Sequence, residues 1–377
     1  MKKDNTGIVR ILHCTFGMNR GGMESRLMDI YRAIDKEKIE FDFLENTEKE
    51  CMYDEEILNL GGKIFYSGYS RKNILKSTKF IKNLFKNHPE YDAVHIHESY
   101  LPSYNSVVKY YAKRYGNKVI LHSRNASGTH PILHNIIKGF HTRNVDFCFA
   151  CSEKAAKWMY TKKKINKKEY KVINNAIDSK KFIYSEKERD KIRKELKIDN
   201  SEIVIGHVGR FFEQKNHIFL INFFKELCLK DSNYRLLLVG DGPLKAEIEN
   251  IVNKYGISDR VDFLGVRKDM TSIYQAFDIF VLPSLFEGLP GVGVEAQASG
   301  LISIFSDKIT NEIQIVEDLT KMLPIDQGVD CWVREIQNCK DRMKDRRNTY
   351  NEICKKGFDI NYVVKDLESF YLEMKNE

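Results

Sequence analysis

Short apolar runs alternate with longer amphipathic segments along the 377 residues of this chain, and the pattern occurs twice. A short apolar run between turn residues predicts a buried strand, and apolar side chains every three or four positions predict a helix. Regular alternation of the two predicts parallel sheets covered by helices. We therefore expect an α/β protein of two Rossmann-like parallel-sheet domains, with ligands bound at the cleft where the domains meet.

A polar, charged stretch at 183–200 separates the two series, so we place residues 1–185 in one domain and 186–361 in the other. In the first half, strands are expected at 8–14, 41–44, 93–97, 118–122, 145–150 and 170–174, and helices at 22–34, 74–85 and 103–115. In the second half, strands are expected at 203–208, 234–239, 261–264, 279–282 and 302–305, and helices at 219–229, 244–255, 270–276 and from about 291.

No apolar run approaches the ~20 residues that a membrane span needs. The apolar stretch after Met1–Gly7 is too short and too interrupted for a secretion signal, so we expect a cytoplasmic protein. The eight cysteines are scattered, and the single CxxC at Cys148 and Cys151 has no second pair to complete a zinc site. No metal is therefore predicted.

Charge is unevenly distributed. Residues 1–185 hold 33 Lys and Arg against 20 Asp and Glu, whereas the remainder holds 28 against 33. Most of the basic excess follows residue 100, and no nucleic-acid-binding motif accompanies it, so no nucleic-acid partner is expected. A solvated basic surface is one interpretation. For the first half as a whole we favour an anionic membrane surface, worth ~1 kcal/mol per nearby basic residue, or a phosphorylated acceptor.

Two glutamates, Glu287 and Glu295, stand on either side of a Gly- and Pro-rich turn that follows the expected strand at 279–282. The first would lie at the carboxyl end of that strand and the second in the opening turn of a helix that begins near Gly291. Open α/β sheets bind ligands at this edge, and a helix N-terminus offers N–H groups to a phosphate. Two acids beside an anion site suit a ligand with hydroxyls and phosphates, such as a nucleotide sugar.

Two cations, Arg210 and Lys215, occur in the loop after the expected strand at 203–208. Arginine brings a planar fork of donors and lysine a compact charge. At a strand's carboxyl end such a pair could neutralise a diphosphate, although two solvated surface cations would give the same sequence.

In the first half, Gly21 and Gly22 follow the first strand and precede the first helix, where bare backbone can approach a phosphate or a sugar closely. His97 lies near the carboxyl end of the expected strand at 93–97, in reach of a sugar hydroxyl. His95 and His122 are weaker candidates, since an isolated strand histidine is more often part of a core.

The segment Gly291–Ala296 matches the dinucleotide fingerprint G-x-G-x-x-A. That fingerprint belongs to the first strand–turn–helix of a domain, whereas this match comes late and behind a long loop. A dehydrogenase is therefore the least favoured class.

Taken together, these motifs resemble those of the retaining GT-B glycosyltransferases of family 4, and the resemblance covers nearly the whole chain. The motifs are Gly21–Glu24, Asp92–His97, Ser152–Glu153, Val172–Asp178, Gly209–Arg210 with Lys215, Gly240–Pro243, and Glu287–Pro290 with Glu295–Ala296. Met18–Glu24 and Ser306–Glu312 are similar to the bacterial exopolysaccharide and capsule type. Ala176 and Gln297 depart from the family pattern at positions that look structural.

The resemblance implies that the second domain binds a nucleotide-diphosphate sugar, with UDP favoured. Arg210 and Lys215 would hold the diphosphate, Glu295 the ribose and Glu287 the sugar hydroxyls. Backbone amides at Gly291 and Val292 would assist the phosphates, and main chain at Val266 would face the base.

The resemblance also implies that the first domain binds the acceptor, a saccharide or a polyprenyl-diphosphate-linked saccharide. Gly21 and Gly22 would contribute backbone contacts, and His97 would touch the donor sugar near the reacting carbon. A C-terminal helix at about 362–377 would pack back on this domain. No metal or other cofactor would be required.

The implied function is sugar transfer with retention into cell-surface polysaccharide, in the cytoplasm at the inner face of the membrane. Three alternatives stay open. A glycosidase also uses paired carboxylates, an epimerase of nucleotide sugars shares the GT-B fold, and a non-catalytic subunit could bind a nucleotide sugar for a partner transferase.

Overall fold

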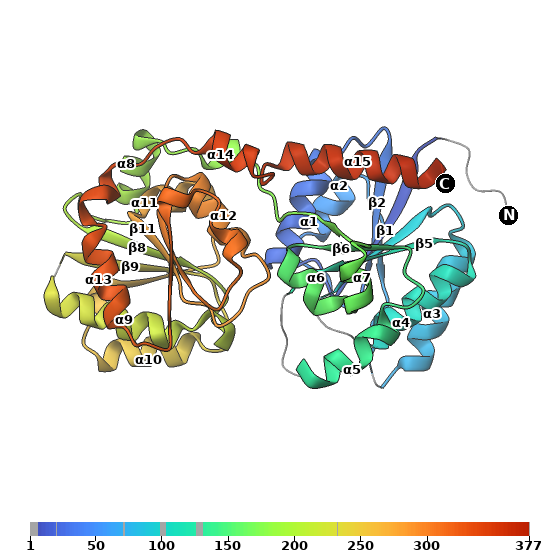
Figure 1. Cartoon of the computed structure of the whole chain (residues 1–377), viewed down its shortest axis with the longest axis horizontal. Coiled ribbons are helices and arrows are strands. Elements are labelled where there is room, and N and C mark those ends of the chain that lie inside the picture. The colour runs from blue at the N-terminus through green and yellow to red at the C-terminus, as the bar shows by residue number, and fades with distance from the viewer. Residues whose placement is uncertain are drawn as a thin grey trace. The chain divides into compact units, whose positions relative to one another are not determined.

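The computed structural model describes residues 7–19, 21–70, 72–98, 103–125, 131–231 and 233–376. The chain forms two compact units, one of Met1–Asn175 with Ile360–Glu377 and the other of Ala176–Asp359 (Figure 1). Each is an α/β unit around one parallel sheet, which confirms the predicted fold class. Arg20, in the expected glycine loop, lies outside the described residues.

The first unit is built on a seven-stranded parallel sheet in the order β3-β2-β1-β4-β5-β6-β7. Its strands are β1 (Val9–Thr15), β2 (Ile39–Glu45), β3 (Ile64–Tyr66), β4 (Ala93–Glu98), β5 (Lys118–Ser123), β6 (Phe147–Ala150) and β7 (Lys171–Val172). Its helices are α1 (Gly22–Ala33), α2 (Asp54–Asn59), α3 (Ile74–Asn87), α4 (Ser103–Arg114), α5 (Pro131–His141), α6 (Glu153–Met159), α7 (Lys162–Asn166) and α15 (Ile360–Asn376). Since β1 lies beside β4, the strand order reverses between them, and ligands of α/β sheets bind at such a point.

The second unit has a six-stranded parallel sheet in the order β10-β9-β8-β11-β12-β13. Its strands are β8 (Ile203–Val208), β9 (Tyr234–Val239), β10 (Val261–Gly265), β11 (Ile279–Leu282), β12 (Ile302–Ser306) and β13 (Thr320–Leu323). Its α-helices are α8 (Glu186–Glu195), α9 (His217–Lys230), α10 (Lys245–Lys254), α11 (Met270–Ala276), α12 (Gly291–Ala298), α13 (Asp330–Asn338) and α14 (Tyr350–Lys355). Short 3-10 helices are η1 (Ser179–Phe182), η2 (Glu213–Lys215), η3 (Ser258–Arg260), η4 (Asn311–Ile313), η5 (Glu317–Leu319) and η6 (Lys340–Lys344). The strand order reverses between β8 and β11.

The chain leaves the first unit at Asn175, ten residues before the predicted boundary at 185. Ile177 and Phe182 are buried in the core of the second unit, and Ile177 forms a parallel bridge with Asp359. Residues 176–185 therefore belong to the second unit because their apolar side chains complete its core.

The charged stretch at 183–200 contains a helix, α8, that is fixed to the second sheet. Arg189 and Arg193 each donate to the Asp278 carboxylate at 2.6 Å, and the backbone N–H of Val204 donates to the same carboxylate at 2.7 Å. A buried carboxylate needs such partners, so the charges that look like a linker in the sequence are structural.

The last helix, α15, belongs to the first unit, where it packs against α1 and β1. Tyr371 and His95 Nδ1 share a hydrogen bond of 2.7 Å, and the N–H of Asp35 donates to Glu368 at 2.8 Å. Within the described residues, no helix combines the length and apolar character that crossing a bilayer requires.

Candidate functional site

The loop after β8 brings Lys215 to Glu287, which follows β11. Lys215 Nζ lies 2.6 Å from Glu287 Oε1, and the two side chains are 15% and 11% exposed. Gly209 makes room for the lysine stem, since a Cβ there would lie 3.0 Å from Lys215 Cδ. The structure thus places a predicted cation and a predicted acid together, where the strand order of the second sheet reverses.

Backbone contacts fix the two loops that carry this pair. Leu285 N–H donates to Gln214 O at 2.8 Å, and the Gln214 side-chain amide donates to Phe286 O at 2.8 Å. The loop after β9 is also held close, because Gly240, at φ +138°, leaves no room for a Cβ beside Gly209 O. Gly240, which belongs to one of the motifs of the family resemblance, therefore has a packing role.

Arg210 lies in the same loop as Lys215 but is exposed. Its guanidinium sits 5.6 Å from the centre of the Phe212 ring. Among the described residues no carboxylate lies within ion-pair distance of it, so its charge is available to a ligand. The structure does not join Arg210 to the Lys215–Glu287 pair.

The N-terminus of α12 begins close after Glu287 in the chain. Pro290 is its N-cap residue and no side chain caps the first turn, so the N–H groups of Gly291 and Val292 are not used by a cap. Gly293 lets the helix pack tightly, since a Cβ there would lie 2.8 Å from Phe305. A phosphate at this point would find donors and a favourable helix dipole.

Glu295 lies one turn into α12 and is only 6% exposed. The Tyr274 hydroxyl contacts Glu295 Oε2 at 2.9 Å and Val292 O at 3.1 Å. Val266, after the last residue of β10, is 53% exposed. Gln297, which looked structural in the sequence, donates to Ile313 O at the end of η4 at 2.8 Å and accepts from the N–H of Val316, after η4, at 2.9 Å.

In the first unit, Gly21 and Gly22 begin α1 at the carboxyl end of β1. No side chain of another residue caps the helix, but the Glu24 side chain folds back over it, and a Cβ on Gly21 would clash with Glu24 Oε2. Burial raises the pKa of Glu24, and its own backbone N–H and Arg124 oppose this. Because an acid already lies there, a sugar hydroxyl fits this loop better than a phosphate.

His97 belongs to a buried cluster of four histidines with His13, His95 and His122, all at most 3% exposed. His97 Nε2 lies 2.9 Å from His13 Nδ1, and His95 Nε2 lies 3.1 Å from His122 Nδ1. Burial, reinforced by Arg124, lowers the pKa of all four, that of His13 to about 3. The cluster is therefore neutral at ordinary pH.

Arg124 sets the tautomer of His97. Its Nε and Nη2 lie 3.2 and 3.0 Å from His97 Nδ1. Burial lowers the pKa of Arg124 to about 10, so it remains a cation with donors only. His97 Nδ1 must then accept, its Nε2 carries the proton, and Nε2–H donates to His13 Nδ1. Both ring nitrogens of His97 are engaged within the first unit.

Sequence reasoning missed Arg124 and Tyr274. Arg124 follows β5, next to the strand of His97, so its place after the expected strand at 118–122 was a usable signal. Tyr274 lies on α11, and no sequence pattern connects it to Glu295. Both act by orienting a predicted residue.

Among the residues that the structure describes, two side-chain groups have ligand atoms close enough for a metal ion: His13, His95 and His97, and Glu45, Cys51 and Asp54. In the first, the Arg124 cation would oppose a divalent ion and no anionic ligand offsets it. In the second, burial raises the pKa of Glu45 to about 7, so at neutral pH a proton competes with a metal ion for this carboxylate.

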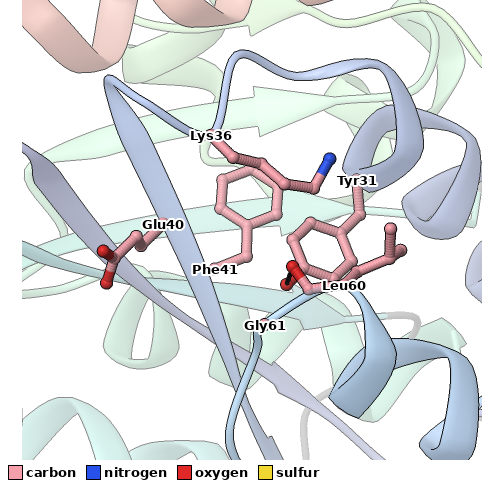
Figure 2. A pocket seen from close by; sticks show the side chains of 6 residues that line it. All are labelled: Tyr31, Lys36, Glu40, Phe41, Leu60 and Gly61. Carbon is pink, nitrogen blue, oxygen red and sulfur yellow. Dashed lines mark hydrogen bonds between the residues drawn. The ribbon is translucent and has the colours of Figure 1, made fainter.

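A cavity of about 210 Å³ lies near the amino end of β2. Figure 2 shows the Lys36 side chain beside the Tyr31 and Phe41 rings, with Glu40 on the other side of the strand. This is the opposite edge of the sheet from Gly22 and the end of β4, and none of the predicted site residues lines the cavity.

Two parallel-sheet units, each with its predicted residues where the strand order reverses, define the architecture of the GT-B glycosyltransferases. A solved structure of Anabaena HepE in complex with UDP and glucose has the same fold, with a TM-score of 0.78 at 17% identity, over 96% of this chain and 99% of that one.

Family models agree with this class. The model described as glycosyl transferases group 1 matches residues 188–355, and that of glycosyltransferase family 4 matches residues 20–181. The chain is 32% identical over 376 residues, 97% of both proteins, to EpsF of Bacillus subtilis (strain 168), which carries the name of a glycosyltransferase. This chain therefore belongs to the family 4 GT-B glycosyltransferases, which confirms the resemblance.

Two further relatives have more specific names. The chain is 25% identical to CapH of Staphylococcus aureus, a capsular polysaccharide biosynthesis glycosyltransferase, over 97% of this chain and 99% of that protein. It is 31% identical over 212 residues, 54% of both proteins, to an Escherichia coli α-1,3-galactosyltransferase that is named for UDP-Gal and α-D-GlcNAc-diphosphoundecaprenol.

Proposed function

We propose that this glycosyltransferase moves a sugar, with retention of its anomeric configuration, from a nucleotide-diphosphate sugar that the second unit binds. The observation that carries the proposal is the 2.6 Å contact between Lys215 and Glu287, which joins the loops after β8 and β11. The cation suits a diphosphate and the acid suits sugar hydroxyls.

Other residues of the second unit complete the donor site in this proposal. Arg210 adds a second cation for the diphosphate, and the N–H groups of Gly291 and Val292 donate to its oxygens. Glu295, oriented by Tyr274, accepts from the ribose hydroxyls. Main chain at Val266 faces the base.

The proposed reaction depends on stabilising the negative charge of the departing diphosphate. The bond between the anomeric carbon and the diphosphate oxygen breaks, and its electron pair leaves with the diphosphate. The acceptor hydroxyl attacks from the same face and gives its proton to the leaving phosphate. Lys215 and Arg210 stabilise the departing charge, a role in which loss of one donor costs ~2.7–4 kcal/mol. These cations and the α12 N-terminus replace a metal ion.

The first unit receives the acceptor in this proposal. Gly21 and Gly22 offer backbone to sugar hydroxyls beside Glu24. In this proposal His97 acts as a neutral donor: a small displacement of the ring moves Nε2–H from His13 Nδ1 to a hydroxyl of the transferred sugar, and Arg124 keeps Nδ1 unprotonated. A role for His97 as a general base is not part of this proposal.

The names of similar proteins guide the choice of substrates. UDP is favoured because HepE was solved with UDP and glucose. A lipid-linked saccharide is favoured as acceptor because the Escherichia coli relative is named for a diphosphoundecaprenol substrate. With the capsular relative, these names support a role in cell-surface polysaccharide synthesis. We propose that the reaction takes place in the cytoplasm at the inner face of the membrane.

A thermal-shift screen across nucleotides and nucleotide sugars tests donor binding, since a ligand of the folded state raises the melting temperature. Transfer to saccharide acceptors, with NMR of the anomeric proton, then tests reaction and stereochemistry. Lys215→Ala should lower turnover about 10²- to 10³-fold, whereas Lys230→Ala, at the exposed end of α9, should not. Unchanged turnover in Lys215→Ala would refute the proposed site, and donor conversion without acceptor would indicate an epimerase.

A further inference from the structure

Two buried acids and a thiol meet where the chain passes from β2 to α2, and we call these three side chains the β2–α2 cluster. Glu45 is the last residue of β2, Asp54 is the first residue of α2, and Cys51 lies in the loop between them. Glu45 is 0% exposed and Asp54 is 5% exposed, whereas Cys51 is partly exposed. One ligand atom of each residue lies within 4.8 Å of those of the other two, and a single metal ion can bridge atoms at such separations.

Each carboxylate of the β2–α2 cluster is oriented through one of its oxygens. Glu45 Oε2 accepts from the N–H of Met18 at 3.1 Å. Asp54 Oδ2 accepts from the Tyr66 hydroxyl at 2.5 Å and from the N–H of Cys51 at 2.7 Å. The second oxygens, Glu45 Oε1 and Asp54 Oδ1, are buried and accept from no hydrogen-bond donor within the described residues. The neighbouring donors therefore fix both acids and leave one buried oxygen of each available to a cation.

No basic side chain balances these two acids. In the part of the chain that the structure describes, neither Glu45 nor Asp54 has a Lys, Arg or His nitrogen within ion-pair distance. Buried charges in proteins are paired or coordinate a metal ion. Burial, the largest effect, and Asp54 raise the pKa of Glu45 to about 7, although the Cys51 thiol and the N–H of Met18 oppose this. A proton shared by the two acids is therefore the alternative to a metal ion.

Cys51 decides which metal ion suits the cluster. Burial and the contact with Glu45 raise the pKa of Cys51 to about 12, so without a metal the sulfur keeps its proton. The Asn19 side-chain amide donates to Cys51 Sγ at 3.4 Å, and such a donor also stabilises a thiolate. Thiolate ligands select zinc over magnesium and calcium, and zinc also accepts carboxylate ligands. The lack of a second cysteine pair, which excludes a four-cysteine site, does not apply to this mixed set of ligands.

We propose that Glu45, Cys51 and Asp54 bind a zinc ion in the first unit, with a water molecule in the fourth position. Zinc binding replaces the proton on Cys51 Sγ, and at neutral pH it also displaces protons from the acids, all of which pass to the solvent. The ion has a structural role. It fixes the loop that leads into α1, because Met18 and Asn19 of that loop contact the cluster. This site does not rest on the proposed function.

Titration of the metal-free full chain with Zn²⁺ against a chromophoric chelator, without donor or acceptor, tests the site. One high-affinity ion per chain should bind with release of protons, and the same concentration of Mg²⁺ should not compete. Co²⁺ in place of zinc should give the near-ultraviolet absorption of a cobalt–thiolate bond, which reports on Cys51 directly. Because zinc binds the folded chain, it should also raise the melting temperature.

Two conservative variants separate a ligand from a residue that orients one. Tyr66→Phe removes the hydroxyl that contacts Asp54, and loss of such an outer partner should weaken zinc binding about 10- to 100-fold. Cys51→Ser removes a ligand, so it should weaken binding by more than about 100-fold. Only Cys51→Ser should abolish the cobalt–thiolate absorption, since Tyr66→Phe keeps the thiol.

Matched controls change the same residue types outside the cluster. Tyr91→Phe removes a similar hydroxyl contact, to Asp42 at 2.6 Å, and Cys331→Ser changes a partly exposed cysteine of the second unit. Both should bind zinc as the parent does. If Tyr91→Phe weakened binding as much as Tyr66→Phe, the affinity would follow the stability of the unit, and the site would be refuted.

The remaining outcomes separate zinc from a shared proton and from the proposed function. Equal zinc affinity in Cys51→Ser and in the parent, or a cobalt spectrum without the thiolate absorption, would overturn the site and leave a proton as the ligand of the two acids. Sugar transfer by a chain that binds no zinc would refute the zinc site alone. Zinc binding by a chain that neither binds a donor nor transfers sugar would support the site and refute the proposed function.

Discussion

The buried histidine cluster predicts how the stability of the first unit depends on pH, and His122→Asn tests it. The pKa of buried His122 is well below its ordinary value of 6.5. As pH falls below 6.5, the unfolded chain takes up a proton at this position and the folded unit does not. Stability therefore decreases as pH falls. Asparagine keeps a polar atom where His122 Nδ1 meets His95 but does not titrate.

The magnitude follows from proton counts. As pH falls from about 7.5 to about 5.5, each buried neutral histidine lowers the free energy of unfolding by about 1.4 kcal/mol, so the four together lower it by about 5.5 kcal/mol. Glu45 and Glu98 act in the opposite sense, since burial raises the pKa of each to about 7. These two carboxyl groups stabilise the folded unit while they are protonated, and this stabilisation is lost as pH rises. Acidification over the same interval therefore restores about 4 kcal/mol of the free energy of unfolding. The parent profile should be shallow there and steepen below about pH 4.5, where the unfolded carboxylates also take up protons.

Comparing the variant with the parent isolates the contribution of His122, because Glu45 and Glu98 contribute equally in both proteins. Relative to the parent, His122→Asn should lose about 1.4 kcal/mol less between about pH 7.5 and pH 5.5. The chain has two tryptophans, one in each unit, so urea unfolding in a Trp332→Phe background reports on the first unit through Trp158. Parallel pH profiles for parent and variant would show that His122 is not a buried neutral group, and the reasoning would fail.

Three further predictions concern single contacts. Asp278→Ala removes the shared acceptor of two arginines and should cost about 3–5 kcal/mol of second-unit stability, measured through Trp332 in a Trp158→Phe background; a loss below about 1 kcal/mol would mean that α8 is held by other contacts. Gly293→Ala should overpack α12 against Phe305 and cost about 1–3 kcal/mol in the same assay, whereas an unchanged urea midpoint would contradict the tight packing. Nitrogen NMR of His97 should show a protonated Nε2 and a bare Nδ1, and the opposite tautomer would exclude the Arg124 contact.

Local patterns predicted most of the fold. The strands at 203–208, 234–239 and 279–282 and the helix at 270–276 were predicted with the bounds that the structure has. Edge strands β3 and β13 were not predicted, because they are short and only partly buried and so lack a continuous apolar run. The boundary was misplaced because the charges of α8 look solvated until Asp278 is seen to accept from them.

Some features of the candidate site could also be predicted from the sequence, and others could not. That Lys215 and Glu287 lie near each other could be predicted, since both follow strands and the carboxyl ends of parallel strands share an edge. The engagement of both His97 nitrogens could not, because it depends on Arg124 and His13, which come from two other strands.

The discontinuous first unit has a consequence for biosynthesis. Tyr371 and Phe370 of α15 complete the wall around His95 and Phe149, yet they leave the ribosome only after the whole second unit. The second unit is one continuous segment and can finish folding earlier. The amino-terminal half must then wait, partly open, for its final helix, and for that interval its exposed apolar sheet would be a substrate for chaperones.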